Sequence, residues 1–223
     1  AQSVCSTGVK FANVWMHNGF VRVDEEKMSK SLGNFFTIRE VLKKYQPEVV
    51  RFFILSSHYR SPLNYSAENL EEAKSSLTRL YTALKESNND NVSIDQDYED
   101  QFNTFMGDDF NTPKAISLLH EIAGKINRIK DESSEDSRRL TVTLKRLGSV
   151  LGLLESKPQD FLQGKNDENI ISIDTKKIDQ LINERNIARR EKDYAKADKI
   201  RKQLIELDVT LEDTEDGTDW RRN

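Results

Sequence analysis

Apolar residues recur at three- and four-residue intervals through most of this chain, and this spacing constrains the fold more than any other feature. It is the spacing at which side chains line one face of an α-helix. One stripe follows Ser66 and consists of Leu70, Ala73, Leu77, Leu80 and Leu84. Similar stripes predict two more amphipathic helices, over 112–130 and 135–154, and a short segment over 102–106. Because each helix can bury its stripe only against another element, the pattern predicts a mainly α chain with an antiparallel helical bundle.

Several helix starts are marked by residues that satisfy free backbone N–H groups. Thr37-Ile38-Arg39-Glu40 is a capping box that opens a short helix. Pro47 occupies a first helical position, and Thr112-Pro113 forms a cap and first-turn pair. Thr175 and Asp193 are predicted to cap two further helices near the end of the chain.

The first 36 residues carry a different pattern, with short apolar runs in place of helical stripes. Two runs over 14–23 flank His17-Asn18-Gly19, and an Asn-Gly pair between apolar runs predicts the turn of a β-hairpin. The polar stretch 24–34 is rich in Lys and Ser, contains Gly33 and predicts a loop.

Two polar stretches divide the helical part of the chain. The first, 86–97, is rich in Asn, Asp and Ser, and the second, 156–174, contains Pro158 and Gly164. Both compositions are typical of connecting segments. The last residues, 209–223, predict a short strand or turn folded back on the final helix pair.

The charge balance excludes a protein that binds nucleic acid over its whole surface. Lys and Arg number 34 against 38 Asp and Glu, which gives a net charge of −4. Contact with a polyanion therefore requires a local basic face. The stretch 175–207 has ten basic and six acidic residues and is a candidate for such a face. A solvated helix pair with paired charges is the alternative.

Cysteine usage and hydropathy favour a cytoplasmic protein. The single cysteine, Cys5, excludes an internal disulfide framework and any Cys-rich zinc site built from this chain alone. No apolar run approaches the roughly 18–20 residues that span a bilayer, and no secretory leader is visible. The chain starts Ala1-Gln2-Ser3 without Met, and we expect it to be part of a longer protein.

The segment Lys27-Met28-Ser29-Lys30-Ser31 is the sharpest chemical signal in the sequence. From ordinary residue frequencies it is expected by chance on the order of once in 10,000 chains of this length. Its two ammonium groups and two hydroxyls can bind nucleotide phosphates and stabilise charge on departing pyrophosphate. Gly33 allows such a loop to open and close, and Met28 can anchor one closed state in an apolar pocket. An exposed loop without a role is the alternative.

This segment matches the KMSKS signature of class I aminoacyl-tRNA synthetases, and its surroundings resemble the cysteinyl-tRNA synthetase family. The resemblance rests on further segments in the family's order, which are Val14-Trp15-Met16-His17-Asn18-Gly19, Ser31-Leu32-Gly33-Asn34, 58–65, 107–113, Lys192-Asp193-Tyr194-Ala195 and 217–222. It covers essentially the whole chain. Within it, His58, Tyr59 and Arg60 lie at a break between helices, where they either touch the tRNA stem or join two domains.

The resemblance implies a domain order. Residues 1–63 would form the end of a Rossmann-type catalytic domain, with a short β-hairpin, the KMSKS loop and a stem-contact region. Residues 64–156 would form the helical bundle and 157–174 a linker. Residues 175–223 would form a small helical C-terminal anticodon-binding domain.

The resemblance also implies an activity. The family uses ATP with Mg²⁺ to activate L-cysteine as cysteinyl-adenylate and transfers it to the 3′ end of cysteine tRNA. By position, Lys30 matches the signature lysine that contacts ATP and steadies the transition state. Lys27 would support it in catalysis, and Met28, Ser29 and Ser31 would complete the ATP-binding loop. In the family, the rest of the ATP site and the zinc site that reads the cysteine thiol lie upstream, so we expect this chain alone to be inactive.

The tRNA-binding residues are likewise implied by the resemblance. Arg189, Asp198 and Asp213 match positions that the family's anticodon-binding domain uses to recognise bases. Trp220 and Arg221 are expected to stack on RNA or to grip its backbone. For Trp220 the alternative is a structural role, since a Trp near a chain end often anchors the tail. The implied partner is cysteine tRNA, bound by a monomer without membrane contact.

Two other functions stay open at this point. A cysteine ligase of mycothiol synthesis shares the catalytic half of the family but carries no anticodon-binding domain. A non-catalytic tRNA-binding or scaffold protein would keep the helical domains and lose catalysis.

Overall fold

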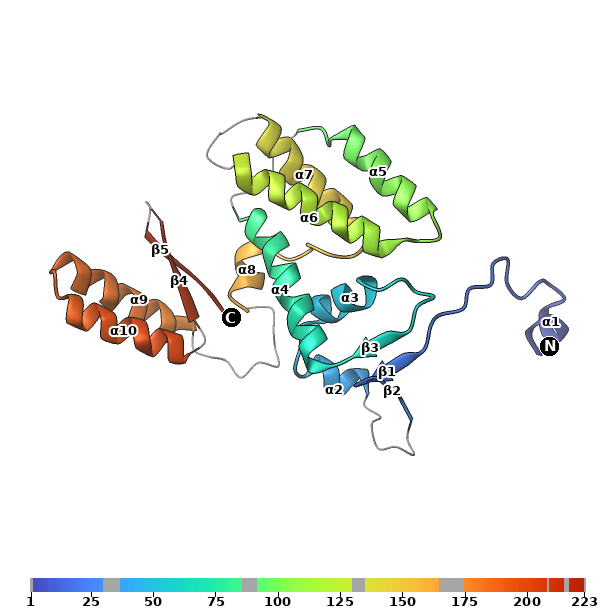
Figure 1. Ribbon diagram of the computed structural model, residues 1–223, viewed down its shortest axis with the longest axis horizontal. Coiled ribbons are helices and arrows are strands. Elements are labelled where there is room, and N and C mark those ends of the chain that lie inside the picture. Colours follow the sequence, from blue (N-terminus) through green and yellow to red (C-terminus); the bar gives the residue numbers. More distant parts are fainter. Residues whose placement is uncertain are drawn as a thin grey trace.

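A computed structural model describes residues 2–29, 37–85, 92–129, 135–164, 175–207, 209–214 and 217–222. Within these ranges the chain is mainly helical, as the apolar periodicity predicts (Figure 1). A small mixed sheet lies near the N-terminus, after helix α1 (Gln2–Thr7), and two strands lie near the C-terminus. None of the helices in the described part of the chain is both long and apolar enough to cross a membrane.

The N-terminal sheet has three short strands in the order β2-β1-β3. β1 (Val21–Val23) and β2 (Glu26–Lys27) form an antiparallel hairpin. Its turn consists of Asp24 and Glu25, whose φ angles of 48° and 69° suit a tight two-residue turn. β3 (Leu63–Tyr65) pairs in parallel with β1 and comes from a segment far along the chain.

The prediction of a hairpin turn at Asn18-Gly19 is wrong, because the turn lies at Asp24 and Glu25. The Gly19 N–H donates to the carbonyl oxygen of Tyr59 at 2.7 Å, and a Cβ on Gly19 would overlap the backbone of Ser61. Glycine at position 19 therefore allows two backbone segments to approach closely. In a sequence, a glycine needed for such an approach looks the same as a glycine needed for a turn. The loop predicted over 24–34 likewise begins with the turn and β2.

Two short helices follow, and both begin where the sequence predicts. α2 (Ile38–Leu42) starts with the capping box, in which the Thr37 N–H donates to Glu40 Oε2 at 2.7 Å and the Glu40 N–H donates to Thr37 Oγ1 at 3.3 Å. α3 (Pro47–Leu55) has Pro47 at its first position. Together they bury Val41, Val49, Phe52 and Phe53 in the main core.

The bundle contains α4 (Ala67–Ala83), α5 (Gln96–Gly107), α6 (Thr112–Ile129) and α7 (Glu135–Val150). Ser66 caps α4 as predicted, since its Oγ accepts the N–H of Asn69 at 3.1 Å. α6 packs against α4, α5 and α7 (Figure 1). The predicted stripe of α4 is buried in this core, which confirms the bundle.

Two helix starts in the bundle differ from the prediction. α5 is longer than the expected segment 102–106, because Asp95 caps it and extends it toward the N-terminus. α6 is capped by Asn111 rather than Thr112, since Asn111 Oδ1 accepts the N–H of Lys114 at 3.3 Å. In both cases a polar side chain just outside the apolar stripe sets the helix start.

A half-buried carboxylate holds the turn after α7. Gly152 and Leu154 have φ of 65° and 63°, and α7 ends at Val150, short of the predicted 154. Glu48 Oε1 accepts the Leu154 N–H at 2.6 Å, and the Tyr81 hydroxyl donates to the same carboxylate, 2.7 Å from Oε2. Burial raises the pKa of Glu48, and these hydrogen bonds offset the rise only in part. One side chain thus connects α3, α4 and the turn.

The stretch expected to be a linker, 157–174, begins with a helix that packs into the main core. α8 (Pro158–Leu162) buries Phe161 and Leu162. The Phe161 ring stacks on the ring of Tyr81, with centroids 4.0 Å apart and 15° between the planes. Residues 165–174 lie outside the described residues.

The end of the chain forms what we call the C-terminal unit. It contains α9 (Thr175–Arg190), α10 (Tyr194–Glu206) and an antiparallel hairpin of β4 (Val209–Thr214) and β5 (Gly217–Arg222). Asp193 caps α10 as predicted, accepting the Lys196 N–H at 3.0 Å. The predicted strand or turn is thus a two-stranded hairpin. The unit has its own core of Ile178, Ile182, Ile200, Leu204, Val209 and Trp220.

Two helical glycines provide a matched test of the packing. Gly124 in α6 has open space where a Cβ would be added, whereas a Cβ on Gly148 in α7 would lie 2.7 Å from Leu154 Cδ1, which is fully buried. We expect Gly148→Ala to lower the free energy of unfolding by about 1–3 kcal/mol through overpacking. Gly124→Ala should raise it by roughly 0.5–1 kcal/mol through helix propensity. Urea unfolding measures both, and a stabilising Gly148→Ala would contradict the packing described.

Candidate functional site

The strand that leads into the KMSKS segment is fixed to β3. The Glu25 N–H donates to Asn64 Oδ1 at 2.9 Å, and Asn64 Nδ2 donates to Glu25 Oε1 at 3.3 Å. The Asp24 N–H donates to the carbonyl oxygen of Tyr65 at 3.1 Å. These contacts hold the turn of the hairpin, so the strand that ends at Lys27 has a defined position.

The described part of the predicted ATP-binding segment is Lys27, Met28 and Ser29, and the remaining two residues, Lys30 and Ser31, lie outside the described residues. Lys27 is exposed, with its Nζ 5.8 Å from the centroid of the Phe20 ring. Met28 and Ser29 are half-buried. The first lysine of the segment is therefore held beside the sheet by a cation–π contact.

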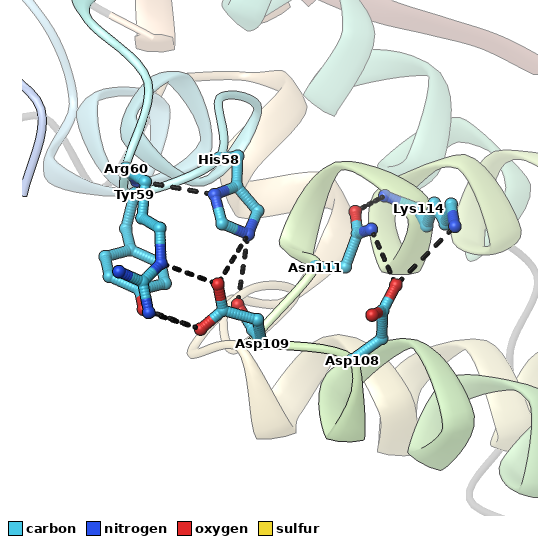
Figure 2. Close-up of polar contacts among 7 residues, drawn as sticks. All are labelled: His58, Tyr59, Arg60, Asp108, Asp109, Asn111 and Lys114. Atoms are coloured by element: carbon cyan, nitrogen blue, oxygen red, sulfur yellow. Dashed lines mark hydrogen bonds and ion pairs between the residues drawn. The ribbon is translucent and has the colours of Figure 1, made fainter. Parts of the chain in front are cut away.

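A polar cluster joins the segment after α3 to the turn between α5 and α6 (Figure 2). Arg60 Nε donates to Asp109 Oδ2 at 2.6 Å, and Arg60 Nη2 donates to Oδ1 at 3.2 Å. The Tyr59 hydroxyl donates to Asp109 Oδ1 at 2.6 Å. His58 Nε2 lies 3.0 Å from the backbone carbonyl oxygen of Asp109. We call these four residues the clasp.

The clasp keeps Asp109 ionised. Hydrogen bonds from Arg60 and Tyr59 lower the pKa of Asp109 to about 2. The hydrogen bond to Asp109 correspondingly raises the pKa of both Tyr59 and Arg60. Because the Arg60 N–H donates to His58 Nδ1 at 3.3 Å, the neutral His58 ring carries its proton on Nε2 and donates it to the Asp109 carbonyl.

The backbone at Asp109 has an unusual conformation. Asp109 and Phe110 have φ of 52° and 53°, in the left-handed region that costs non-glycine residues about 1–3 kcal/mol each. Beside them, Asn111 Nδ2 donates to Asp108 Oδ2 at 3.3 Å, and Lys114 Nζ lies 3.7 Å from the same oxygen (Figure 2). The clasp and this second group of three polar residues hold the turn from both sides.

The contacts in the clasp distinguish the roles of Tyr59 and Arg60, which the sequence leaves open. The Tyr59 hydroxyl is committed to Asp109, which supports the role of joining two parts of the chain. The Arg60 side chain also binds Asp109. It is nevertheless 56% exposed, so part of its surface is accessible to a partner. No sequence signal pairs Arg60 with Asp109, since the two lie 49 positions apart and neither is part of a spaced motif with the other.

The C-terminal unit exposes two of the predicted base-reading residues. Arg189 is exposed in the last turn of α9, and Asp198 is exposed on α10. Asp213 lies in β4, where its backbone pairs with Thr218. Tyr194, which the sequence places with the apolar residues of this helix and not among the base-reading residues, is 64% exposed at the start of α10. The sequence signal that could have identified Tyr194 as a candidate is an aromatic residue within a basic stretch.

Trp220 and Arg221 occupy different environments on β5. Trp220 is 6% exposed within the core of the C-terminal unit, and its Nε1 donates to Asp179 Oδ1 at 3.2 Å. A buried indole presents no free face to a base, so the structure supports the tail-anchoring alternative for Trp220. Arg221 is half-exposed, with its Nε 3.4 Å from Glu212 Oε1.

Comparison with models of known protein families gives three matches in chain order. Residues 1–75 match the tRNA synthetases class I (C) catalytic domain, 101–155 match the DALR domain, and 175–221 match the Cysteinyl-tRNA ligase anticodon binding domain. The cysteine–tRNA ligase of Laribacter hongkongensis is 55% identical over 225 residues, which cover all of this chain and 48% of that protein. The chain belongs to the cysteine–tRNA ligase family.

Other cysteine–tRNA ligases show the same extent of similarity. That of Thioalkalivibrio sulfidiphilus is 52% identical over 223 residues, and that of Tolumonas auensis is 50% identical over 224 residues. In each case the match covers all of this chain and 48% of the relative, so the chain spans about half the length of the curated relatives it matches. The family resemblance drawn from the KMSKS segment is confirmed. The anticodon-binding match argues against the ligase of mycothiol synthesis, which lacks that domain.

The clasp makes a testable prediction about pH. Arg60→Ala removes the largest cause of the low pKa of Asp109, so we expect that pKa to rise from about 2 toward its ordinary value of 3.8. Because the folded-state pKa is depressed, the clasp stabilises the fold fully above the ordinary pKa and loses its effect as pH falls toward 2. NMR titration of the Asp109 carboxyl measures both values. Lys114→Ala serves as the control, and an unchanged pKa in Arg60→Ala would contradict the clasp.

Proposed function

We propose that this chain carries the ATP loop and the anticodon-reading part of an enzyme that joins cysteine to cysteine tRNA. The match of residues 175–221 to an anticodon binding domain carries the proposal. The charge distribution supports it, because residues 175–207 hold ten basic and six acidic residues in a chain whose net charge is −4. Phosphate contacts are therefore concentrated on α9 and α10.

The proposed chemistry at the KMSKS segment is charge stabilisation. ATP with Mg²⁺ and cysteine form cysteinyl-adenylate and pyrophosphate, and negative charge gathers on the departing pyrophosphate. The ammonium groups of Lys27 and Lys30 stabilise that charge, and the hydroxyls of Ser29 and Ser31 donate hydrogen bonds to phosphate oxygens. Met28, which is half-buried, anchors the closed loop.

The proposed tRNA contacts follow the surface of the C-terminal unit. Arg189 donates to base carbonyls, and Asp198 and Asp213 accept from base amino and imino groups. Arg221 contacts the RNA backbone. The protein acts as a monomer, and the tRNA 3′ end receives the activated cysteine.

We assign no zinc ligand to this chain. Across the described ranges, the structure holds no group of three or more His, Cys, Asp or Glu side chains suited to a metal ion. In the proposed enzyme, the zinc that reads the cysteine thiol is held by residues outside this chain.

A tRNA-binding protein without catalytic activity is the second candidate. It is favoured by the extent of the match, since the catalytic domain model matches only residues 1–75 and the chain spans 48% of the Laribacter hongkongensis ligase. Both candidates bind tRNA, and they differ in whether a polypeptide containing this chain forms cysteinyl-adenylate. Exchange of labelled pyrophosphate into ATP in the presence of cysteine separates them.

Anticodon-dependent binding tests the proposal. At one fixed salt concentration, we expect the chain to bind cysteine tRNA more tightly than transcripts with single anticodon changes. Arg189→Ala should cost about 1–3 kcal/mol in binding free energy and reduce discrimination between the transcripts. Arg146→Ala, which removes an exposed arginine from α7, is the matched control. Fluorescence anisotropy measures the dissociation constants, and binding indifferent to the anticodon would contradict this proposal.

Nucleotide binding by the chain alone gives a separate expectation. We expect millimolar-range affinity for ATP, since one loop without its partner half encloses little of the nucleotide. Lys30→Ala should abolish this binding. Isothermal titration calorimetry measures it, and micromolar affinity would contradict the assignment of half the ATP site to residues outside the chain.

A further inference from the structure

Two carboxylates face each other across the C-terminal hairpin. Glu212 on β4 and Asp219 on β5 are direct partners in the strand register, so their side chains share one face of the hairpin. Like charges at directly opposed positions destabilise a strand pair. The hairpin therefore needs a cation at this point.

That cation comes from another part of the chain. Lys85, just past the end of α4, places its Nζ 2.8 Å from Glu212 Oε2 and 2.8 Å from Asp219 Oδ2. The remaining oxygens are also in contact: Arg221 Nε lies 3.4 Å from Glu212 Oε1, and Gln159 Nε2 donates to Asp219 Oδ1 at 3.3 Å. Each carboxylate is thus held on both sides.

The Lys85 ammonium is well shielded from solvent, with a side chain that is 16% exposed. Burial lowers the pKa of Lys85, but hydrogen bonds to Asp219 and Glu212 outweigh this, so the pKa lies above its ordinary value. The lysine stays charged at neutral pH, and both ion pairs are formed together.

The contact matters because the two parts of the chain have separate cores. The buried cluster of α2–α8 and that of the C-terminal unit share no residue in the described chain. Polar groups connect the hairpin to the α4–α8 region, with Lys85 and Gln159 on one side and the two carboxylates on the other. In the described part of the chain, Lys85 thus makes two of the polar contacts that can orient the C-terminal unit.

We propose that Lys85 is a positioning residue that sets the orientation of the C-terminal unit relative to the helical bundle by bridging Glu212 and Asp219. The residue after Glu212 is Asp213, which is proposed to read a base, and its backbone belongs to the same hairpin. Lys85 thereby holds the C-terminal unit in the orientation that binds tRNA, without contacting tRNA itself. This consequence for tRNA rests on the proposed function, whereas the bridge itself does not.

A distance measurement tests the bridge directly. In a Cys5→Ser background, Ser149→Cys on α7 and Gln203→Cys on α10 place spin labels on two exposed positions, one on each part. We expect a narrow distance distribution by pulsed electron paramagnetic resonance, which becomes broad in Lys85→Met. It should stay narrow in Lys85→Arg, which keeps the charge, and in Lys145→Met, which removes an exposed lysine from α7. A narrow distribution in Lys85→Met overturns the proposal.

A second set of variants separates orientation from unfolding. The indole NMR signal of buried Trp220 reports whether the C-terminal unit keeps its own core. We expect this signal to be retained in Lys85→Met while the distance distribution broadens. Because Lys85→Met leaves two opposed carboxylates, adding Glu212→Gln should make the hairpin more stable than in Lys85→Met alone. Loss of the Trp220 signal in both variants would overturn a role confined to orientation.

Binding of cysteine tRNA supplies the functional readout. We expect Lys85→Met to weaken binding about tenfold, through loss of a pre-organised surface, and Lys85→Arg to restore most of the affinity. If the tRNA does not bind even to the unmodified chain, the proposed function fails while the distance measurement still decides the bridge. Unchanged binding together with a broad distance distribution would overturn the consequence for tRNA.

Discussion

The parallel pairing of β1 with β3 is the contact on which the arrangement of the functional segments depends. It requires Gly19, where two backbones approach too closely for any side chain. Through this contact, the hairpin that leads into the KMSKS segment is attached to the segment that carries His58, Tyr59 and Arg60. That segment in turn reaches the bundle through Asp109. A proposed nucleotide loop and a helical bundle are thereby parts of one continuous structure.

Polar groups make two of the connections between parts of the chain, beside the apolar core that α2 and α3 share with the bundle. The clasp joins the N-terminal part to the bundle through one aspartate, and Lys85 joins the bundle to the C-terminal unit through two carboxylates. Ionic contacts of this kind are directional and sensitive to salt, unlike the apolar contacts inside each part. Such connections fix the orientation of one part relative to another and can still be released.

Sequence patterns predicted the helices, because amphipathic stripes and caps are local signals. The starts at Thr37, Pro47, Ser66 and Asp193 follow from groups within a few residues. The starts of α5 and α6 were missed because of local polar caps, whereas the other failures come from contact between distant segments. Asn18-Gly19 gave a turn signal for what is a close backbone approach, and no local pattern could pair Arg60 with Asp109 or Lys85 with Glu212. The KMSKS segment was recognised because its chemistry is carried by consecutive residues.

We propose that the C-terminal unit reads the anticodon of cysteine tRNA. Photo-crosslinking tests it most directly, with a photoreactive nucleotide placed in turn in the anticodon and in the acceptor stem. Mass spectrometry then locates the crosslinked peptides. We expect anticodon crosslinks to fall within residues 175–222, on α9, α10 and the β4–β5 hairpin. Two results would contradict anticodon reading by the C-terminal unit. In one, the anticodon crosslinks are confined to the bundle; in the other, acceptor-stem crosslinks form but anticodon crosslinks do not.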